Sequence, residues 1–251
     1  MSDSLSVLPS ITQLISIGLF LYTAYWAFTI RRVLAVPLFR KQALWVGIVG
    51  TYFAATFSYA RLGGVYSTTN PLTNFIGSFL FFLGFIMIFA WVDVTVRIAR
   101  KTDPLRRDTF RWRRIRTIIW AILVIVPTSV FALALPLLAS NQSPSGIELL
   151  PALLTIIAIM LSAGPALLLS GSRSKDSTLR RHLKWFGLFV LSLFAAVVGG
   201  FSLYLIHAVV IPIVGFVVGY TPFIFAAYCL YRGARSLVPI GHLQLADPPS
   251  Q

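Results

Sequence analysis

The sequence is short of the residues that build enzyme active sites. It contains one cysteine, seven acidic residues and three histidines among 251 residues. A single cysteine forms neither an intrachain disulfide nor a cysteine metal cluster. The histidines lie too far apart along the predicted helices to share one metal or haem iron, and no second carboxylate accompanies Asp93. We therefore expect no catalytic, metal-binding or cofactor-binding residues, and no enzyme.

Charge is also scarce. Charged residues make up 11% of the chain and hydrophobic residues 57%, whereas a soluble domain carries about 25% charged residues. Apolar stretches of roughly 20 residues recur, which is enough to cross a bilayer core of about 30 Å. The composition predicts a multi-pass integral membrane protein, which we expect in the cell membrane.

The apolar stretches predict an all-α, seven-helix transmembrane bundle within residues 1–235, followed by a short cytoplasmic tail at 236–251. The expected spans are residues 11–30, 43–60, 72–92, 117–139, 147–170, 185–207 and 210–231. The last two merge into one run over residues 185–231, which is too long for a single crossing. A turn is predicted at 206–212, where His207 and Pro212 interrupt the run.

The cations orient this bundle. Twenty of the 21 lysines and arginines fall within residues 31–41, 97–116, 173–184 and 232–235, and only Arg61 lies on the other side. Cytoplasmic loops carry the excess of Lys and Arg in membrane proteins. The N-terminus is therefore predicted outside and the C-terminus in the cytoplasm.

A cation precedes a tryptophan by four residues at the start of each span that rises from the cytoplasm. The three pairs are Lys41–Trp45, Arg116–Trp120 and Arg181–Trp185. Residues four apart share one helix face, and tryptophan favours the membrane interface. Trp45, Trp120 and Trp185 are therefore predicted to be interfacial anchors.

Asp93 is the one carboxylate predicted at membrane depth, near the cytoplasmic end of the third span. Arg97 follows four residues later on the same helix face. One interpretation is a local ion pair at the inner interface. The alternative is a switch pair, or a proton or cation site, because ionisable groups inside a membrane are costly and are often functional.

The cytoplasmic loops form candidate binding surfaces for anionic lipid or for an acidic protein partner. The residues assigned to this role are Arg106, Arg107, Arg111, Arg113, Arg114, Arg116, Arg180, Arg181 and Lys184. No nucleic-acid-binding motif accompanies them, and we expect no nucleic acid partner.

Small residues in the last two spans predict close helix packing. Gly199 and Gly200 are adjacent in the sixth span, and Gly215 and Gly219 form a G-x-x-x-G pattern in the seventh. Packing within the bundle is one interpretation, and an oligomer seam is the other.

The seven-helix plan with the N-terminus outside is similar in architecture to that of rhodopsins and other seven-helix receptors. A retinal protein needs a lysine within its last helix, and no lysine lies in the seventh predicted span. We expect a non-enzymatic, receptor-like or signalling protein that couples to a partner through its basic cytoplasmic face. Two alternatives stay open, an accessory subunit of a larger membrane complex and a transporter of small molecules or lipids.

Overall fold

A computed structural model describes residues 2–61, 71–101, 146–206 and 221–240, together with residues 114, 116–122, 125 and 129. Every regular element within these residues is a helix, so the all-helical class is confirmed there. The helices are α1 (Ser2–Ile30), α2 (Pro37–Arg61), α3 (Pro71–Lys101), α5 (Gly146–Arg173), α6 (Ser177–Ile206), α8 (Thr221–Arg235) and the single turn α9 (Leu237–Ile240). Most of the predicted span 117–139, and the predicted turn beyond Ile206, lie outside the described residues.

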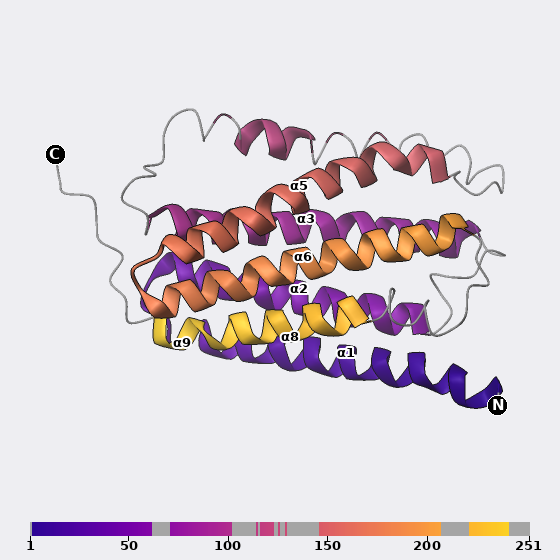
Figure 1. Cartoon of the computed structure of the whole chain (residues 1–251), viewed down its shortest axis with the longest axis horizontal. Helices are drawn as coiled ribbons and strands as arrows, with labels where there is room; N and C mark the ends of the chain where they lie inside the picture. Colours follow the sequence, from indigo (N-terminus) through magenta and orange to yellow (C-terminus); the bar gives the residue numbers. More distant parts are fainter. Residues whose placement is uncertain are drawn as a thin grey trace.

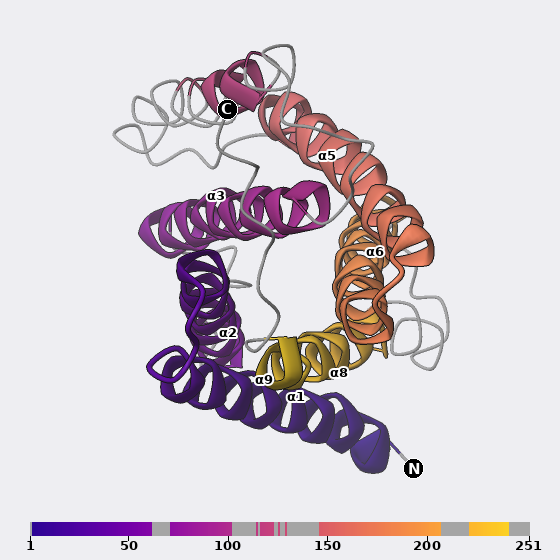
Figure 2. The same ribbon diagram turned by 90° about the vertical axis from the view of Figure 1, so that its left-hand side faces the viewer.

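The long helices run side by side along one axis (Figure 1). Viewed along that axis they follow one another around a ring, which α8 closes by packing against α1 (Figure 2). α1 also packs against α2, α2 against α3, α3 against α5, and α6 against both α5 and α8. Helices from both ends of the sequence therefore share one core.

Two kinds of residue set the helix starts. α2 and α3 begin at Pro37 and Pro71, and proline suits a first helical turn because it has no N–H to lose there. α6 is capped by Asp176, whose Oδ1 accepts hydrogen bonds from the backbone N–H of Thr178 at 2.7 Å and of Leu179 at 3.0 Å. This cap starts α6 well before the predicted span at 185–207. His182, which the sequence assigns to a loop, is therefore a helical residue.

The centre of the bundle is aromatic. Trp91 of α3 is fully buried and meets two rings of α6 edge-on, Phe186 at 4.7 Å and Phe189 at 5.1 Å between ring centroids. Phe189 in turn contacts Phe53 of α2, which stacks on Phe20 of α1 at 5.0 Å. These aromatic contacts link four helices across the bundle, in the arrangement that edge-to-face and offset ring pairs favour.

The outer face of α1 is apolar along the predicted membrane span. Ile15 is 53% exposed and Tyr25 is 69% exposed, whereas Ser16 and Thr23 are buried. The Thr23 hydroxyl is satisfied within its own helix, because it donates to the Leu19 carbonyl at 2.7 Å. A helix on the surface of a soluble bundle shows the reverse pattern, with its polar face outward.

Among the described residues, Ile11–Ile30 is the one stretch that is long and apolar enough to cross a membrane. That criterion rests on length and composition, which a signal sequence or a buried core helix also satisfies.

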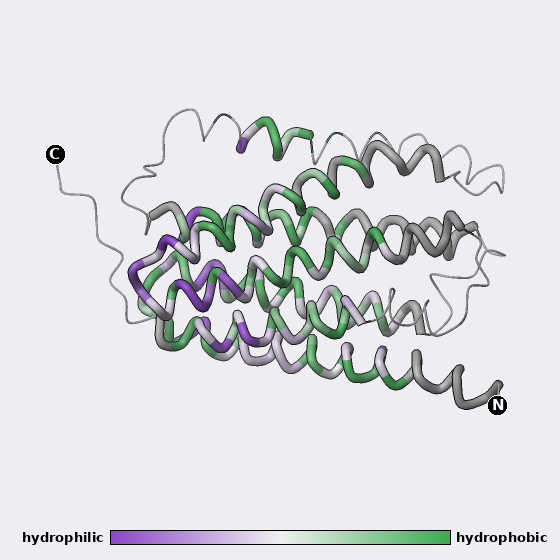
Figure 3. The backbone as a smooth tube through the Cα atoms, viewed as in Figure 1, coloured by the Kyte–Doolittle hydropathy of each residue, from purple (hydrophilic) through white to green (hydrophobic). Residues whose placement is uncertain are grey.

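Hydrophilic residues gather at one end of the bundle, where α5 turns into α6 and where α9 lies (Figure 3). We call this the basic end. The described cations at the helix ends that meet there include Arg31, Arg32, Arg40, Lys41, Arg97, Arg100, Lys101, Arg173, Lys175, Arg180, Arg181, Lys184, Arg232 and Arg235. Arg61 is the last residue of α2, at the opposite end of that helix.

Candidate functional site

Asp93 lies between two arginines near the basic end. Arg97 Nη2 donates to Asp93 Oδ2 at 2.7 Å, and Arg116 Nε lies 3.7 Å from Asp93 Oδ1. The carboxylate is only 6% exposed, whereas the Arg97 and Arg116 side chains are 34% and 27% exposed. The predicted pair with Arg97 is present, and Arg116 joins it from the 114–129 segment. Asp93 therefore ties that segment to α3.

Arg97 does not make a bidentate contact with the Asp93 carboxylate. Its Nε is buried and has no hydrogen-bond partner in the described structure. An arginine facing one carboxylate commonly uses two N–H groups on its two oxygens. Here the second oxygen of Asp93 is turned toward Arg116, which accounts for the single bond from Arg97.

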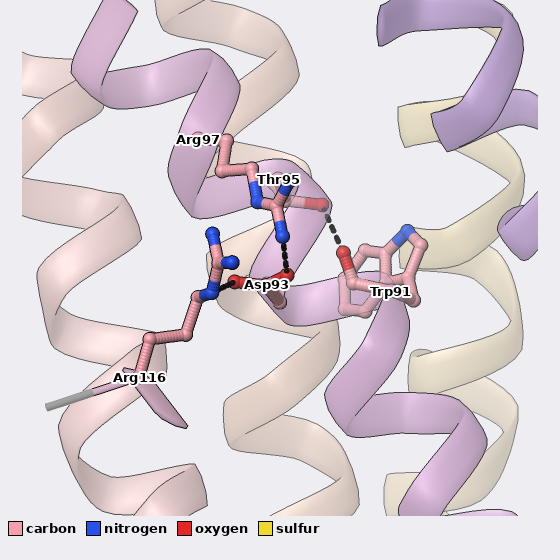
Figure 4. Close-up of polar contacts among 5 residues, drawn as sticks. All are labelled: Trp91, Asp93, Thr95, Arg97 and Arg116. Atoms are coloured by element: carbon pink, nitrogen blue, oxygen red, sulfur yellow. Dashed lines mark hydrogen bonds and ion pairs between the residues drawn. The ribbon is translucent and has the colours of Figure 1, made fainter. Parts of the chain in front are cut away.

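The opposite side of α3 carries uncharged polar contacts. Figure 4 shows Arg97 and Arg116 converging on Asp93, while the Thr95 hydroxyl points away from them toward the Trp91 carbonyl, to which it donates at 2.9 Å. Each residue turns a helix by about 100°, so positions 93 and 95 project to nearly opposite sides. α3 thus separates a charged group from a neutral one.

The neutral contacts continue through Gln42 of α2. Its Nε2 donates to Thr95 Oγ1 at 3.0 Å, and its Oε1 lies 3.0 Å from His182 Nε2 on α6. All three side chains are fully buried. Because the Thr95 hydroxyl donates to its own helix, it accepts from Gln42, and this fixes which end of the amide faces the histidine.

The other ring nitrogen of His182 faces the junction of α8 and α9. Nδ1 lies 2.7 Å from Ser236 Oγ and 3.2 Å from the Gly233 carbonyl oxygen. Ser236 is 7% exposed and its hydroxyl also lies 2.6 Å from the Gly233 carbonyl. The first residues of the predicted tail, Ser236 and Leu237, are therefore part of the core.

We call Thr95, Gln42, His182 and Ser236 the polar chain. It joins α3, α2, α6 and the α8–α9 junction through direct side-chain contacts. With Gln42 Oε1 as an acceptor, His182 carries its proton on Nε2. The one hydrogen of the Ser236 hydroxyl is shared between the Gly233 carbonyl at 2.6 Å and His182 Nδ1 at 2.7 Å. Each of the four side chains has at least one hydrogen-bond partner, which lowers the cost of burying it.

His182 is kept neutral by its surroundings. Burial lowers the pKa of His182 from 6.5 to about 3, and the Gly233 carbonyl opposes this shift only in part. His182 precedes the predicted span at 185–207, so the shift comes from the protein packed around it. At neutral pH the polar chain therefore contains no formal charge.

The predicted tryptophan anchors have different neighbours. Arg232 of α8 lies over the Trp185 ring, with its Cζ 5.3 Å from the centroid. Trp120 meets Phe89 edge-on at 4.8 Å. Trp45 is half-buried and packs against the core. The cation placed on Trp185 thus comes from another helix, and the cation that precedes Trp120 is bound to Asp93.

The predicted basic surface is divided. Arg106, Arg107, Arg111 and Arg113 lie outside the described residues. Arg114, Arg181 and Lys184 are exposed, while Arg116 faces Asp93. Arg180 donates from Nη2 to the Ser174 carbonyl at 2.9 Å and so helps to close the α5–α6 turn.

α5 and α6 pack closely through glycines that the sequence did not single out. A Cβ on Gly164 of α5 would meet Leu191 at 2.8 Å, and one on Gly187 of α6 would meet Leu168 at 2.8 Å and the Gly164 carbonyl at 3.1 Å. Gly199 is buried on α6. The surroundings of Gly200, and both Gly215 and Gly219, lie outside the described residues.

Comparison of the chain with protein-family models, with curated proteins and with solved structures gives no match.

The sequence reasoning missed the polar chain. One signal was available around His182, because Leu179, His182, Leu183 and Phe186 follow the spacing of a buried helix face while the cations between them point outward. Gln42 and Ser236 gave no comparable signal. Their partners lie 140 and 54 positions away along the chain.

Proposed function

We propose that the chain is a seven-span, non-enzymatic membrane protein of the receptor or signalling type, placed in the cell membrane with its basic end in the cytoplasm. In this proposal the bundle adopts more than one state, and the basic end presents that state to a protein partner amid anionic lipid.

Membrane placement is supported by the surface of the bundle. The exposed residues of α1 between positions 11 and 28 are apolar, aromatic or glycine, and large apolar side chains are also exposed on α5 and on the 114–129 segment. Lipid tails accept such a surface at no cost, whereas water does not. The gathering of cations at one end agrees with the predicted orientation.

The observation that carries the coupling role is the polar chain. Four parts of the bundle meet through one buried set of hydrogen bonds at the basic end. A shift of α3 or α2 that breaks the Gln42 contacts leaves His182 Nε2 unsatisfied, and the other ring nitrogen of His182 contacts Ser236. The α8–α9 junction therefore responds to movement elsewhere in the bundle, which is the property that signal transmission requires.

Amide hydrogen exchange in detergent tests this coupling. Replacing Gln42 with leucine should speed exchange roughly fivefold or more, both in residues 95–101 of α3 and in residues 236–240, because a net hydrogen bond contributes about 1 kcal/mol. Thr23→Val is the matched control, since that hydroxyl is equally buried and bonds only within α1. Faster exchange confined to α2 would contradict the coupling role.

An accessory subunit of a larger membrane complex is the second candidate. The apolar stripe of α1, with Tyr22 51% and Tyr25 69% exposed, favours it, because aromatic residues are enriched in protein interfaces. Purification in mild detergent followed by native mass spectrometry separates the two candidates. A single species carrying only lipid supports the receptor type, and a partner in fixed stoichiometry supports the subunit. No described feature favours a transporter over either.

A further inference from the structure

Some arginine side chains near the basic end contact a carboxylate, and others lie over aromatic rings. Arg97 and Arg116 contact the Asp93 carboxylate, which offsets their charge. Arg232 lies over two aromatic rings, with its Cζ 5.3 Å from the Trp185 centroid and 5.9 Å from the Tyr228 centroid. Aromatic rings fix the plane of a guanidinium without using its N–H donors.

The rings form a corner between α6 and α8. Trp185 and Tyr228 are perpendicular, with centroids 5.7 Å apart, and Arg232 contacts both. Tyr228 is 39% exposed and Arg232 is exposed. In the described part of the chain, no carboxylate contacts Arg232. Its N–H groups are therefore preoriented, accessible and available to an external anion.

Toward its N-terminus, the same face of α8 is apolar. Phe225 lies seven residues before Arg232, so the two residues align along the helix, and Phe225 is 45% exposed. On the α6 side, Arg181 is exposed one turn beyond Trp185, nearer to the basic end. The surface between α6 and α8, which we call the groove for short, presents an apolar ring, amphipathic rings and then two cations in that order.

We propose that this groove binds one anionic phospholipid, with its headgroup phosphate on Arg232 and Arg181 and an acyl chain along Tyr228 and Phe225. A guanidinium donates two parallel hydrogen bonds to phosphate oxygens, and amphipathic rings favour the boundary between headgroups and tails. The inference rests on the membrane placement proposed above. It replaces the broad basic surface with a single site between two helices.

Lipid binding to the purified full-length chain in detergent tests the site. Native mass spectrometry should show that wild-type chain retains phosphatidylglycerol at least about fivefold better than phosphatidylcholine, the effect expected for one cation near a membrane surface. Arg232→Gln should reduce this preference about fivefold, because Arg181 remains. Tyr228→Leu should reduce it severalfold although the charge is kept, because the ring no longer orients the guanidinium.

Arg180→Gln is the matched control for charge. It removes one positive charge from α6, at a side chain that bonds the Ser174 carbonyl, and should leave the preference within about twofold. Equal losses in Arg180→Gln and Arg232→Gln would overturn the site in favour of diffuse attraction. An unchanged preference in Arg232→Gln would overturn it directly. Displacement of the lipid by inorganic phosphate at equal concentration would instead assign the groove to free anions.

A different result would show that the proposed membrane placement, rather than the lipid site, is wrong. If carbonate washing released wild-type chain and all variants from cell membranes alike, the proposed membrane function would be wrong. If the variants stayed in the membrane and melted at the wild-type temperature without phosphatidylglycerol, a lost preference would concern the groove alone.

Discussion

The two sides of α3 hold polar groups in opposite ways. On one side, Gln42, Thr95 and His182 are neutral and fully buried, and each has a hydrogen-bond partner. On the other, Asp93 is buried but its arginine partners keep about a third of their surface in solvent, and Arg97 Nε has no partner. Neutral groups can be fully buried at low cost once their hydrogen bonds are made. Charged groups cost more to bury, so part of their surface stays in contact with solvent.

The largest effect should come from breaking the polar chain at its centre. His182→Leu leaves Gln42 Oε1 without a partner and removes one of the two contacts of Ser236 Oγ, which still donates to the Gly233 carbonyl. A buried polar group left unsatisfied costs about 1–3 kcal/mol, and a lost hydrogen bond costs about 1 kcal/mol. We expect a loss of about 2–5 kcal/mol in the free energy of unfolding, measured by thermal or denaturant melting in detergent. Thr23→Val should change it by less than about 1 kcal/mol. Similar losses in the two variants would show that the polar chain stabilises the fold no more than a hydroxyl bonded within its own helix.

Neutralising Asp93 should cost less. Asp93→Asn keeps the shape but leaves two arginines facing an amide, and partial exposure lets water solvate them. We expect a loss of about 1–2 kcal/mol in the same melting experiment. Added salt should narrow the gap between Asp93→Asn and wild type, because it screens exposed charges. A loss larger than that of His182→Leu would reverse the comparison between the two sides.

Acidification should act on the polar chain with a predictable sign. The folded pKa of His182 is lowered to about 3, below the unfolded value of 6.5, so between these pH values the unfolded chain binds the proton and the folded chain does not. Stability from this group is complete above about pH 6.5 and falls by about 1.4 kcal/mol per pH unit as the pH drops toward 3. Melting between pH 7.5 and 5.5 should show this loss in wild type.

His182→Leu should lack that part of the pH dependence, since it has no imidazole to titrate. The same pH slope in the variant and in wild type would assign the effect to other groups.

Helices were the part of this fold that local pattern could predict. The apolar runs mark α1, α2, α3, α5 and α6, but the predicted ends were set by bilayer thickness rather than by helix signals. α3 continues to Lys101 and α6 begins at Ser177, because a helix does not stop where the bilayer core ends. The cap at Asp176 and the prolines that open α2 and α3 were the readable signals for the true ends.

In the candidate site, too, only the contacts within one helix could be predicted from local pattern. Asp93 and Arg97 share one helix face, so their pairing follows from a spacing of four. Arg116 and the polar chain depend on contacts between helices, and no local pattern carries that information. The cations around His182 indicate a charged surface, whereas the residue there that contacts two other parts of the bundle is the neutral histidine between them.

The contact between Gly164 and Gly187 has a mechanical consequence. With backbone this close to backbone and leucine side chains filling both sides, α5 and α6 have little freedom to slide or rotate against each other. The pair should therefore move as one rigid body. Any rearrangement of the bundle then has its hinges elsewhere, at the boundaries that this hairpin shares with α3 and α8.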